Sequence, residues 1–457
     1  MQDLAFATAT ELTAAIRERR VSPLEVLEAH LGQIRRHNPA LNAVVTLDEE
    51  GARRRAREAG EALARGEVWG SLHGLPMTLK DAHSTAGMRT TAGYPPLAEY
   101  MPQEDGTVAA RLKGSGAIII GKTNVAELLM DIQSDNPVFG RTNNPSHLGR
   151  TSGGSSGGAC AALASGMTPL EIGSDYAGSI RIPAHFCGVY GLKTTERRVS
   201  LAGHISAPHG RARTDRIQWC IGPVARSIED LGLAYHIIAG ADLHDPEVPP
   251  LSLAGEPLPA LRDLSIAWAP TFPGVPVATA IREAIRGLAA ELGRLGARVE
   301  ERLPEVDFKE MAKVRLLLSR AVSEAFEPVE GEPPVSLADY FTALDRRDGF
   351  IYEWERFFLE WDALLCPVAM TTAFPHRPAD TPIPVDGQEV NYWRVIGHCA
   401  PFNLTGHPSV VIPVGRDPEG LPIGVQIAGK RWGEERLLAI AGLLAELAGP
   451  FQRPPDM

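Results

Sequence analysis

The start of the chain follows the hydrophobic periodicity of two helices. Residues 1–20 have the pattern of an amphipathic helix, without the basic leader and unbroken apolar core of a secretory signal. A second helix is predicted from Pro23, because Ser22 and Glu25 form a capping box around a proline that suits the first helical position. Pro39 predicts its end. Its apolar residues share one face: Leu24, Leu27, Leu31 and Ile34.

From about residue 74 the pattern changes to short apolar runs between glycine-rich turns. Continuous runs of this length suit strands that are buried on both faces of an α/β sheet. The return to such runs after residue 400 favours one interleaved domain. Strands are predicted within 74–81, 117–124, 168–175, 409–415 and 423–429, and a final helix over 434–448.

The stretch between about 240 and 400 is richer in proline and less regular than the rest of the chain. Residues 246–259 and 332–341 are interpreted as surface excursions. We expect this variable stretch to select the substrate.

Composition narrows the classes of function. Hydrophobic residues make up 44% and charged residues 22% of the 457 residues, as in an ordinary soluble globular chain. The net charge of −11, with no basic block, argues against direct binding of nucleic acid. No apolar run reaches the roughly 18 residues that span a bilayer. Five widely spaced cysteines predict buried, reduced thiols, and we expect a cytoplasmic protein.

The most unusual stretch is a glycine-serine turn at residues 153–158, followed by an alanine-rich run that predicts a helix. Glycines let a substrate approach the main chain, and the free N–H groups at the start of a helix favour negative charge. A phosphate-binding loop would need lysine after the last glycine, where Ala159 stands. The turn fits G-x-S-x-G with either Ser155 or Ser156, but the polar, turn-forming residues before it do not suit a nucleophile elbow, which follows a strand.

A second glycine-serine turn covers residues 173–181, at the end of a predicted strand. Consecutive small residues can present several backbone N–H groups to one point, as in an oxyanion hole. Lys80, one of only seven lysines, ends the predicted strand within 74–81. Two such turns and a lysine could supply a nucleophile, a relay and a base without histidine. His185 is interpreted as a packed residue, and no metal or other cofactor is expected.

Seven stretches of the sequence together match one known family. They are LHGLPMTLKDA (72–82), GAIIIGKTNVAE (116–127), NPVFGRTNNP (136–145), the turn at 153–158, GSDYAGSIRIPAHFCGVYGLK (173–193), GPVARSIEDL (222–231) and GLPIGVQIAG (420–429). With them, the sequence resembles the amidase signature family over most of residues 70–235 and again near the C-terminus. The resemblance implies a single α/β domain over residues 1–457, a large mixed β-sheet sandwiched between helices, and a Ser-cisSer-Lys triad. The signature core would cover about 70–235, the variable substrate side about 240–400, and the C-terminal strands and helix about 401–448.

By position, the resemblance implies Ser179 as the nucleophile, Ser155 as the cis-serine that relays its proton, and Lys80 as the base. A serine hydroxyl is a poor nucleophile until its proton is removed. Lysine can accept that proton only when neutral, and an ordinary lysine is less than about 0.1% neutral at pH 7. Burial would lower the pKa of Lys80 by removing water from the ammonium, so we expect activity to rise toward alkaline pH.

The resemblance also implies an oxyanion hole near the nucleophile. Three residues depart from the family pattern, of which Ala177 matters most, because it stands where the family usually has glycine; the others are Ser152 and Thr194. A Cβ at a position that needs positive φ would cost about 1 kcal/mol and could shift one oxyanion donor. The implied donors are the backbone N–H groups of Tyr176, Ala177, Gly178 and Ser179.

Supporting residues follow from the same resemblance. Asp175 and Arg181 flank the nucleophile, and we expect an ion pair that braces the turn rather than contact with substrate. Ser156 is expected to support the triad. The family's pocket-lining stretch corresponds to Leu129, Met130 and Asp131, although core packing explains the first two equally well.

These residues imply an amidohydrolase that forms an acyl-Ser179 intermediate, expels ammonia or an amine, and releases the acyl group to water. Esters or carbamates could also be cleaved. We expect a small-molecule amide substrate and no nucleic-acid or membrane partner, and a homodimer is left open. Two alternatives stand beside this prediction. One is the glutaminase-type subunit of a tRNA-dependent amidotransferase, and the other is a catalytically silent relative that acts as a binding scaffold, motivated by Ala177.

Overall fold

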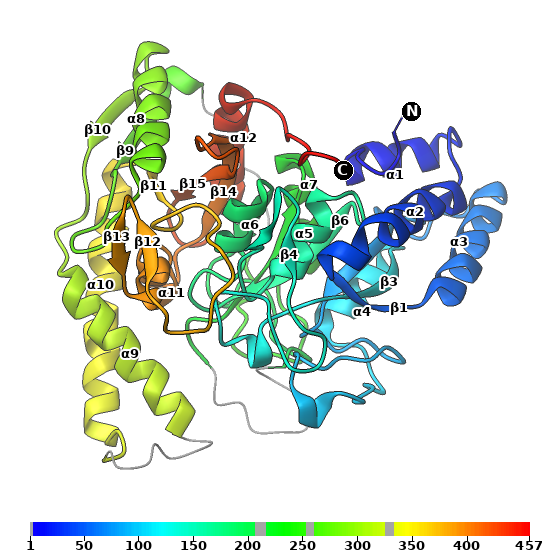
Figure 1. Cartoon of the computed structure of the whole chain (residues 1–457), viewed down its shortest axis with the longest axis horizontal. Coiled ribbons are helices and arrows are strands. Elements are labelled where there is room, and N and C mark those ends of the chain that lie inside the picture. The colour runs from blue at the N-terminus through cyan, green and yellow to red at the C-terminus, as the bar shows by residue number, and fades with distance from the viewer. Residues whose placement is uncertain (1–2, 206–215, 253–259, 325–332) are drawn as a thin grey trace.

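The computed structural model describes residues 3–205, 216–252, 260–324 and 333–457. Its largest sheet has eight strands (Figure 1): β6 (Leu170–Asp175), β7 (Tyr190–Lys193), β8 (Cys220–Ala225), β9 (Ser265–Trp268), β10 (Arg298–Glu301), β11 (Ala363–Pro367), β14 (Ser409–Arg416) and β15 (Pro422–Ala428). Their order is β10-β9-β11-β15-β14-β7-β8-β6. Strand β9 is parallel to both β10 and β11, whereas the other neighbours are antiparallel. The predicted mixed sheet is confirmed.

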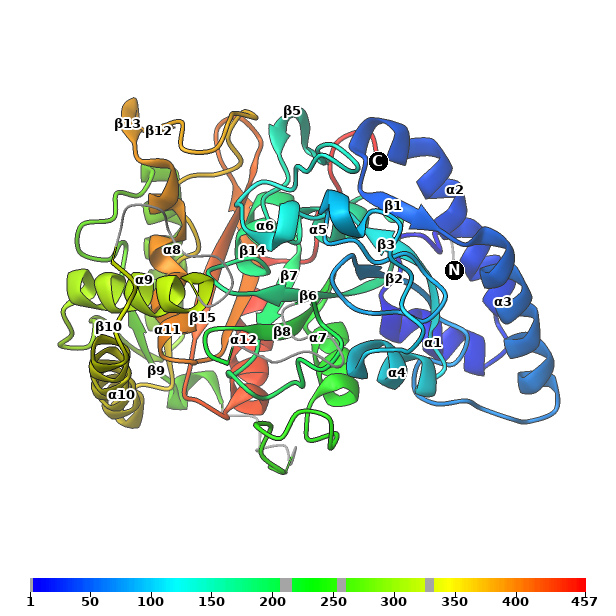
Figure 2. The ribbon, with the colours of Figure 1, turned by 90° about the horizontal axis from the view of Figure 1, so that it is seen from below.

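Side chains of successive strand residues enter opposite layers of core, as the strand period of two requires. In β14, Val410 and Ile412 pack on one side of the sheet and Val411 on the other. The first side is covered by α7 (Ile228–Ile238), α8 (Thr279–Arg294) and α12 (Glu434–Ala448). The opposite side is covered by two groups, α5 (Gly157–Ala164) with α6 (Arg181–Cys187), and α9 (Phe308–Glu324) with α10 (Leu337–Glu360) and α11 (Ala400–Leu404) (Figure 2).

A smaller sheet brings Lys80 to the edge of the large one. It has the order β1-β3-β2, with β2 parallel to β3 and β1 antiparallel to it. Strand β2 lies against β6, so that the ends of both strands meet. The elements are β1 (Val44–Leu47), β2 (Pro76–Lys80) and β3 (Ile118–Thr123), with α1 (Ala9–Arg17), α2 (Pro23–Leu41), α3 (Glu49–Ala64) and α4 (Thr107–Gly114) around them.

Short elements complete the chain. Two hairpins, β4 (Asn143–Asn144) with β5 (His147–Thr151) and β12 (Ile383–Val385) with β13 (Gln388–Val390), stand apart from the larger sheets. The 3-10 helices are the single turns η1 (Pro95–Leu97), η2 (Glu127–Leu129) and η3 (Leu261–Asp263) and the longer η4 (Tyr392–His398).

The predicted strands and several helices are confirmed. The strand predictions correspond to β2, β3, β6, β14 and β15, and the final helix is α12. The capping box of α2 is present: Ser22 Oγ accepts from the Glu25 backbone at 3.2 Å, and the Glu25 carboxylate accepts from the Ser22 backbone at 2.7 Å. Of the helix predicted over residues 1–20, the structure has α1 over Ala9–Arg17 only; residues 3–8 form turns, and residues 1 and 2 lie outside the described part.

Two boundary predictions are wrong. Helix α2 continues past Pro39 to Leu41, because a proline in the last turn removes only one helical hydrogen bond, and Asn42 then ends the helix with a φ of 51°. Residues 332–341 are not a surface excursion throughout, because α10 begins at Leu337, where Ser336 Oγ accepts from the Asp339 backbone at 3.1 Å.

The other predicted excursion is irregular over residues 246–252, as expected. Residues 253–259 of this excursion, and residue 332 of the one over 332–341, lie outside the described residues. All five cysteines are buried free thiols. Within the described ranges, no helix combines the length and apolarity needed to cross a membrane.

Candidate active site

Lys80 is the last residue of β2 and is fully buried. Its Nζ lies 2.8 Å from Ser155 Oγ, 2.8 Å from Ser156 Oγ and 3.0 Å from Ser174 Oγ, and the Ser174 carbonyl accepts a longer bond at 3.3 Å. Both glycine-serine turns therefore converge on one amine. The sequence-predicted pair of Lys80 and Ser155 is in direct hydrogen-bond contact.

The surroundings of Lys80 favour its neutral form. Burial lowers the pKa of Lys80 to about 7, and the acidic groups Asp175, Cys160 and Glu171 oppose this shift. Their opposition is incomplete because Asp175 is engaged elsewhere and burial raises the pKa of Glu171 to about 8. Near neutral pH, Lys80 can thus act as a proton acceptor, which an ordinary surface lysine cannot.

The first turn has little room for side chains. The Gly154–Ser155 peptide is cis, as the resemblance implied. A Cβ on Gly154 would lie 2.6 Å from the Gln133 backbone nitrogen, so only glycine fits there. Ser134 fastens the turn, since its Oγ donates to the Ser155 carbonyl at 3.1 Å and accepts from Gly157 N at 2.8 Å.

The stretch before this turn contains a strand, which the sequence pattern did not predict. Strand β5 ends at Thr151; it pairs with β4 and forms one bridge, from Arg150 to Pro375, but it does not belong to the large sheet. Helix α5 begins at Gly157, after the turn. The arrangement therefore still differs from a nucleophile elbow, in which the strand before the serine belongs to the central sheet.

Ser179 lies in the second turn, between β6 and α6, and is half-buried. The Ser156 backbone N–H donates to the Ser179 carbonyl at 3.1 Å. This bond joins the two turns directly beside Ser155. The backbone of Ser179 is thus held next to the Lys80–Ser155 contact, and the partial exposure of this residue leaves it accessible to a substrate.

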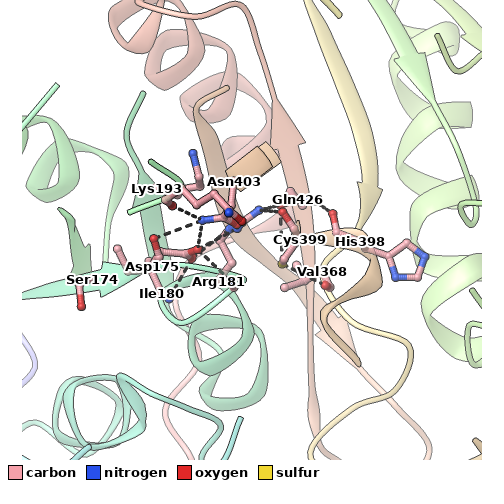
Figure 3. Close-up of polar contacts among 12 residues, drawn as sticks. Ser174, Asp175, Ile180, Arg181, Lys193, Val368, His398, Cys399, Asn403 and Gln426 are labelled. Atoms are coloured by element: carbon pink, nitrogen blue, oxygen red, sulfur yellow. Dashed lines mark hydrogen bonds and ion pairs between the residues drawn. The ribbon is translucent and has the colours of Figure 1, made fainter. Parts of the chain in front are cut away.

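Asp175 and Arg181 form the expected ion pair beneath this turn (Figure 3). Both side chains are fully buried, with Arg181 Nη2 2.9 Å from Asp175 Oδ1 and Nε 3.0 Å from Oδ2. Asn403 Nδ2 donates to Asp175 Oδ1 at 2.9 Å, and Gln426 Oε1 accepts from Arg181 at 2.6 Å. Burial alone would raise the pKa of Asp175, but the Arg181 guanidinium outweighs it and holds that pKa well below its usual range.

Asp175 also shapes the proposed oxyanion donors. Its carboxylate accepts from Gly178 N at 2.8 Å and from Ile180 N at 3.0 Å, so the Gly178 amide is occupied in this structure. Among the described residues, the amides of Ala177 and Ser179 have no hydrogen-bond partner. The positive φ of the turn, 122°, falls on Gly178, and Ala177 is not among the described residues with positive φ. The alanine at position 177 therefore adds no backbone strain.

Two polar groups at the site were not predicted. Ser174 lies within the second turn, and its Oγ contacts both Lys80 and, at 3.0 Å, Nε2 of the buried His204. Burial lowers the pKa of His204 to about 3, which keeps its ring neutral. Lying 30 residues further along the chain, His204 has no motif around it that could have marked it. His185, by contrast, is packed as expected: it accepts from Gly424 N at 2.6 Å and bonds the Thr371 carbonyl.

The stretch of Leu129 to Asp131 passes close to the first turn. A Cβ on Gly154 would lie 2.7 Å from the Asp131 carbonyl oxygen, and Asp131 Oδ1 accepts from Tyr392 Oη at 2.6 Å. Leu129 is buried in the core, as expected if it serves core packing. Met130 is 61% exposed and is therefore not a core residue.

Fold and site together fit hydrolases that use serine with a lysine base in place of histidine. The sequence matches the amidase family over residues 25–332 and 334–438, and the chain belongs to that family. It is 32% identical to an acylamidase of Rhodococcus erythropolis over 96% of this chain and 95% of the relative, and 31% identical to a glutamyl-tRNA(Gln) amidotransferase subunit of Roseiflexus sp. over 98% of each. The solved structure of a bacterial aryl acylamidase of the amidase signature family superimposes with a TM-score of 0.84 at 26% identity, covering 99% of both chains. The protein is thus a hydrolase of carbon–nitrogen bonds other than peptide bonds.

Proposed function

We propose that the protein is a free-standing amidase that cleaves a small carboxylic amide through an acyl-Ser179 intermediate. The observation that carries this proposal is the buried Lys80 amine, which has a pKa of about 7 and contacts Ser155 at 2.8 Å, beside Ser179. A neutral amine can donate its two protons to Ser156 and Ser174 and keep its lone pair for the Ser155 hydroxyl.

The first half-reaction moves one proton along this chain. Ser179 Oγ attacks the amide carbonyl carbon as its proton passes to Ser155 and the Ser155 proton passes to Lys80. The negative charge on the carbonyl oxygen is received by the free amides of Ala177 and Ser179. When the tetrahedral intermediate collapses, the carbon–nitrogen bond breaks, and the departing amine takes its proton back from Lys80 through Ser155.

The second half-reaction repeats these transfers with water. Lys80, neutral again, accepts through Ser155 a proton from the water that attacks the acyl carbon. The bond to Ser179 Oγ then breaks, and Ser179 recovers its proton. Ester and carbamate substrates fit the same steps, because each presents a carbonyl carbon and a leaving heteroatom.

This proposal is tested by measuring the release of ammonia or amine from aliphatic, aryl and cyclic amides, with Ser179→Ala as the test variant. We expect Ser179→Ala to lose at least about 10³-fold in turnover. Ser115→Ala, at the distant end of α4, is the matched control and should keep wild-type turnover. Wild-type turnover by Ser179→Ala would contradict the assigned nucleophile.

The amidotransferase subunit is a second candidate, because relatives of that name match almost the whole chain. The similarity to acylamidases supports a chain that works alone. Glutamine-specific ammonia release that requires copurified partner subunits would favour the second candidate. Failure of a serine-directed phosphonate to label Ser179 in folded protein would favour the silent scaffold.

A further inference from the structure

A cavity of about 630 Å³ lies between α9, η4 and α11. Ala400 lines it, and the preceding Cys399 packs on the turn itself: a Cβ on Gly178 would lie 3.0 Å from Cys399 Cβ. On the α9 side, Ser319 Oγ lies 2.8 Å from Tyr176 Oη, three residues before Ser179. The α9 segment and the junction of η4 and α11, which form two walls of the cavity, are therefore in contact with the turn that carries the nucleophile.

The cavity has an apolar body and a positive charge. Phe272, Phe308 and Leu404 are part of its apolar wall. Among the described residues that line it there are four cationic side chains and no carboxylate, although the chain as a whole has a net charge of −11. The cationic residues are Lys309, Lys313, Arg315 and Arg394.

These four cations are not equivalent. Lys309, Lys313 and Arg394 are exposed, and Lys313 already contacts a carboxylate, Glu310, at 3.3 Å. Arg394 donates to the Gly274 carbonyl at 3.0 Å. They form a positively charged rim, which attracts anions but fixes none of them in place.

Arg315 differs because it is only half-exposed and, within the described chain, has no hydrogen-bond or ion-pair partner. Burial lowers its pKa and the nearby Tyr176 phenol opposes this shift only in part, so the guanidinium has lost part of its hydration without gaining a carboxylate partner. Arg315 precedes Ser319 by one helical turn, and residues four apart lie on the same helix face about 6 Å from each other. Its guanidinium thus belongs to the side of α9 that faces Tyr176.

We propose that this cavity binds an acidic group on the amide substrate, with the carboxylate on Arg315 and the apolar part of the substrate against Phe272, Phe308 and Leu404. This inference rests on the proposed function and names its substrate class, amides with an apolar body that ends in an acid. A guanidinium and a carboxylate can form two parallel charge-assisted hydrogen bonds, which gives both affinity and orientation. The acid can belong to the acyl or to the amine side of the scissile bond.

Matched substrates test the proposal in hydrolysis. Glutaric acid monoanilide is compared with pentananilide for the acyl side, and para-acetamidobenzoate with acetanilide for the amine side, at about pH 8, where the acids are ionised. We expect the wild type to prefer the acid of at least one pair. Arg315→Gln should lower kcat/KM for that acid by about 10- to 100-fold, mainly through KM, and leave the neutral partner within about twofold.

Two further variants separate recognition from a general loss of charge. Arg286→Gln, an exposed site on α8, removes the same charge elsewhere and should change neither substrate. Arg315→Lys should restore part of the preference. Equal cleavage of acid and neutral substrates by the wild type, or an equal loss of both in Arg315→Gln, would overturn the proposal.

Calorimetric binding of phenylbutyrate and of neutral phenylbutanol tests the cavity independently of turnover. We expect the wild type to bind the acid at least about tenfold more tightly than the alcohol, and Arg315→Gln to lose this difference. Retention of this difference together with no amide hydrolysis would reject the proposed function and keep the anion site. Amide hydrolysis without any preference for the acid would keep the proposed function and reject the anion site.

Discussion

The rate of amide hydrolysis should follow the neutral fraction of Lys80. In the structure Nζ is fully buried, and its pKa falls from 10.5 to about 7. Below that pH the amine is protonated and cannot accept the proton of Ser155. We therefore expect kcat/KM to rise about tenfold per pH unit below about pH 7 and to level off above about pH 8.

The size of the effect follows from the shift of this pKa. At pH 7 a lysine with a pKa of about 7 is roughly half neutral, whereas one at 10.5 would be about 0.03% neutral. Burial thus increases the active form on the order of 10³-fold at neutral pH. The amine of Lys80 is buried because β2 and both glycine-serine turns pack around it.

Glu171 is a buried acid whose own ionisation could be mistaken for that of Lys80, and its glutamine variant is a control. Its carboxylate accepts from Thr78 Oγ1 at 2.7 Å and from Thr123 Oγ1 at 2.9 Å, and its pKa is raised to about 8 by burial. Glutamine imitates the protonated acid, so Glu171→Gln should leave the acid limb of the profile within about half a pH unit of the wild type.

The assay is kcat/KM for one amide between about pH 5 and 10, because this parameter reports the ionisation of the free enzyme. A single ionisation near pH 7, present in both wild type and Glu171→Gln, is the expected result. A flat profile between about pH 6 and 9, or an ionisation near the ordinary lysine value, would refute the assignment of Lys80 as the base.

Further predictions concern the ion pair and the stability of the site. Asp175→Asn should lower the free energy of unfolding by about 3–5 kcal/mol in chemical denaturation, because it leaves the Arg181 charge buried without its partner. The control Glu300→Gln, in an exposed pair with Arg298, should leave that free energy unchanged. Equal effects of the two substitutions would contradict the bracing role of Asp175. Between about pH 7 and 10.5 the unfolded chain binds a proton at Lys80 that the folded chain does not. The free energy of unfolding of the wild type, relative to Lys80→Met, should therefore rise by up to about 1.4 kcal/mol per pH unit in this range. A difference between the two proteins that does not change with pH would contradict the lowered pKa.

The backbone of the site could be predicted because its signals are local. Buried strands such as β2 and β6 need continuous apolar runs, and glycine is required where another main chain approaches, as Gly154 approaches Gln133. The pairing of Lys80 with Ser155 came from a family resemblance, since nothing in the spacing of two residues 75 apart fixes their contact.

The rest depends on tertiary contacts that leave no local pattern. His204 reaches Ser174 from 30 residues away, and the unpaired guanidinium of Arg315 is unusual only once the cavity around it is known. The predicted end of α2, at Pro39, comes too early. A proline in the last turn of a helix removes only one helical hydrogen bond, so the helix can continue past it.

Trapping the acyl-enzyme tests most directly whether Ser179 is the nucleophile. The protein is mixed with an activated ester or aryl amide, quenched in acid within the first turnover, and digested, and the peptide spanning residues 173–181 is weighed by mass spectrometry. We expect the acyl mass on Ser179 in the wild type and its absence in Ser179→Ala. Acyl mass on Ser155 instead, or full turnover by a protein that never carries the acyl group, would contradict this role of Ser179.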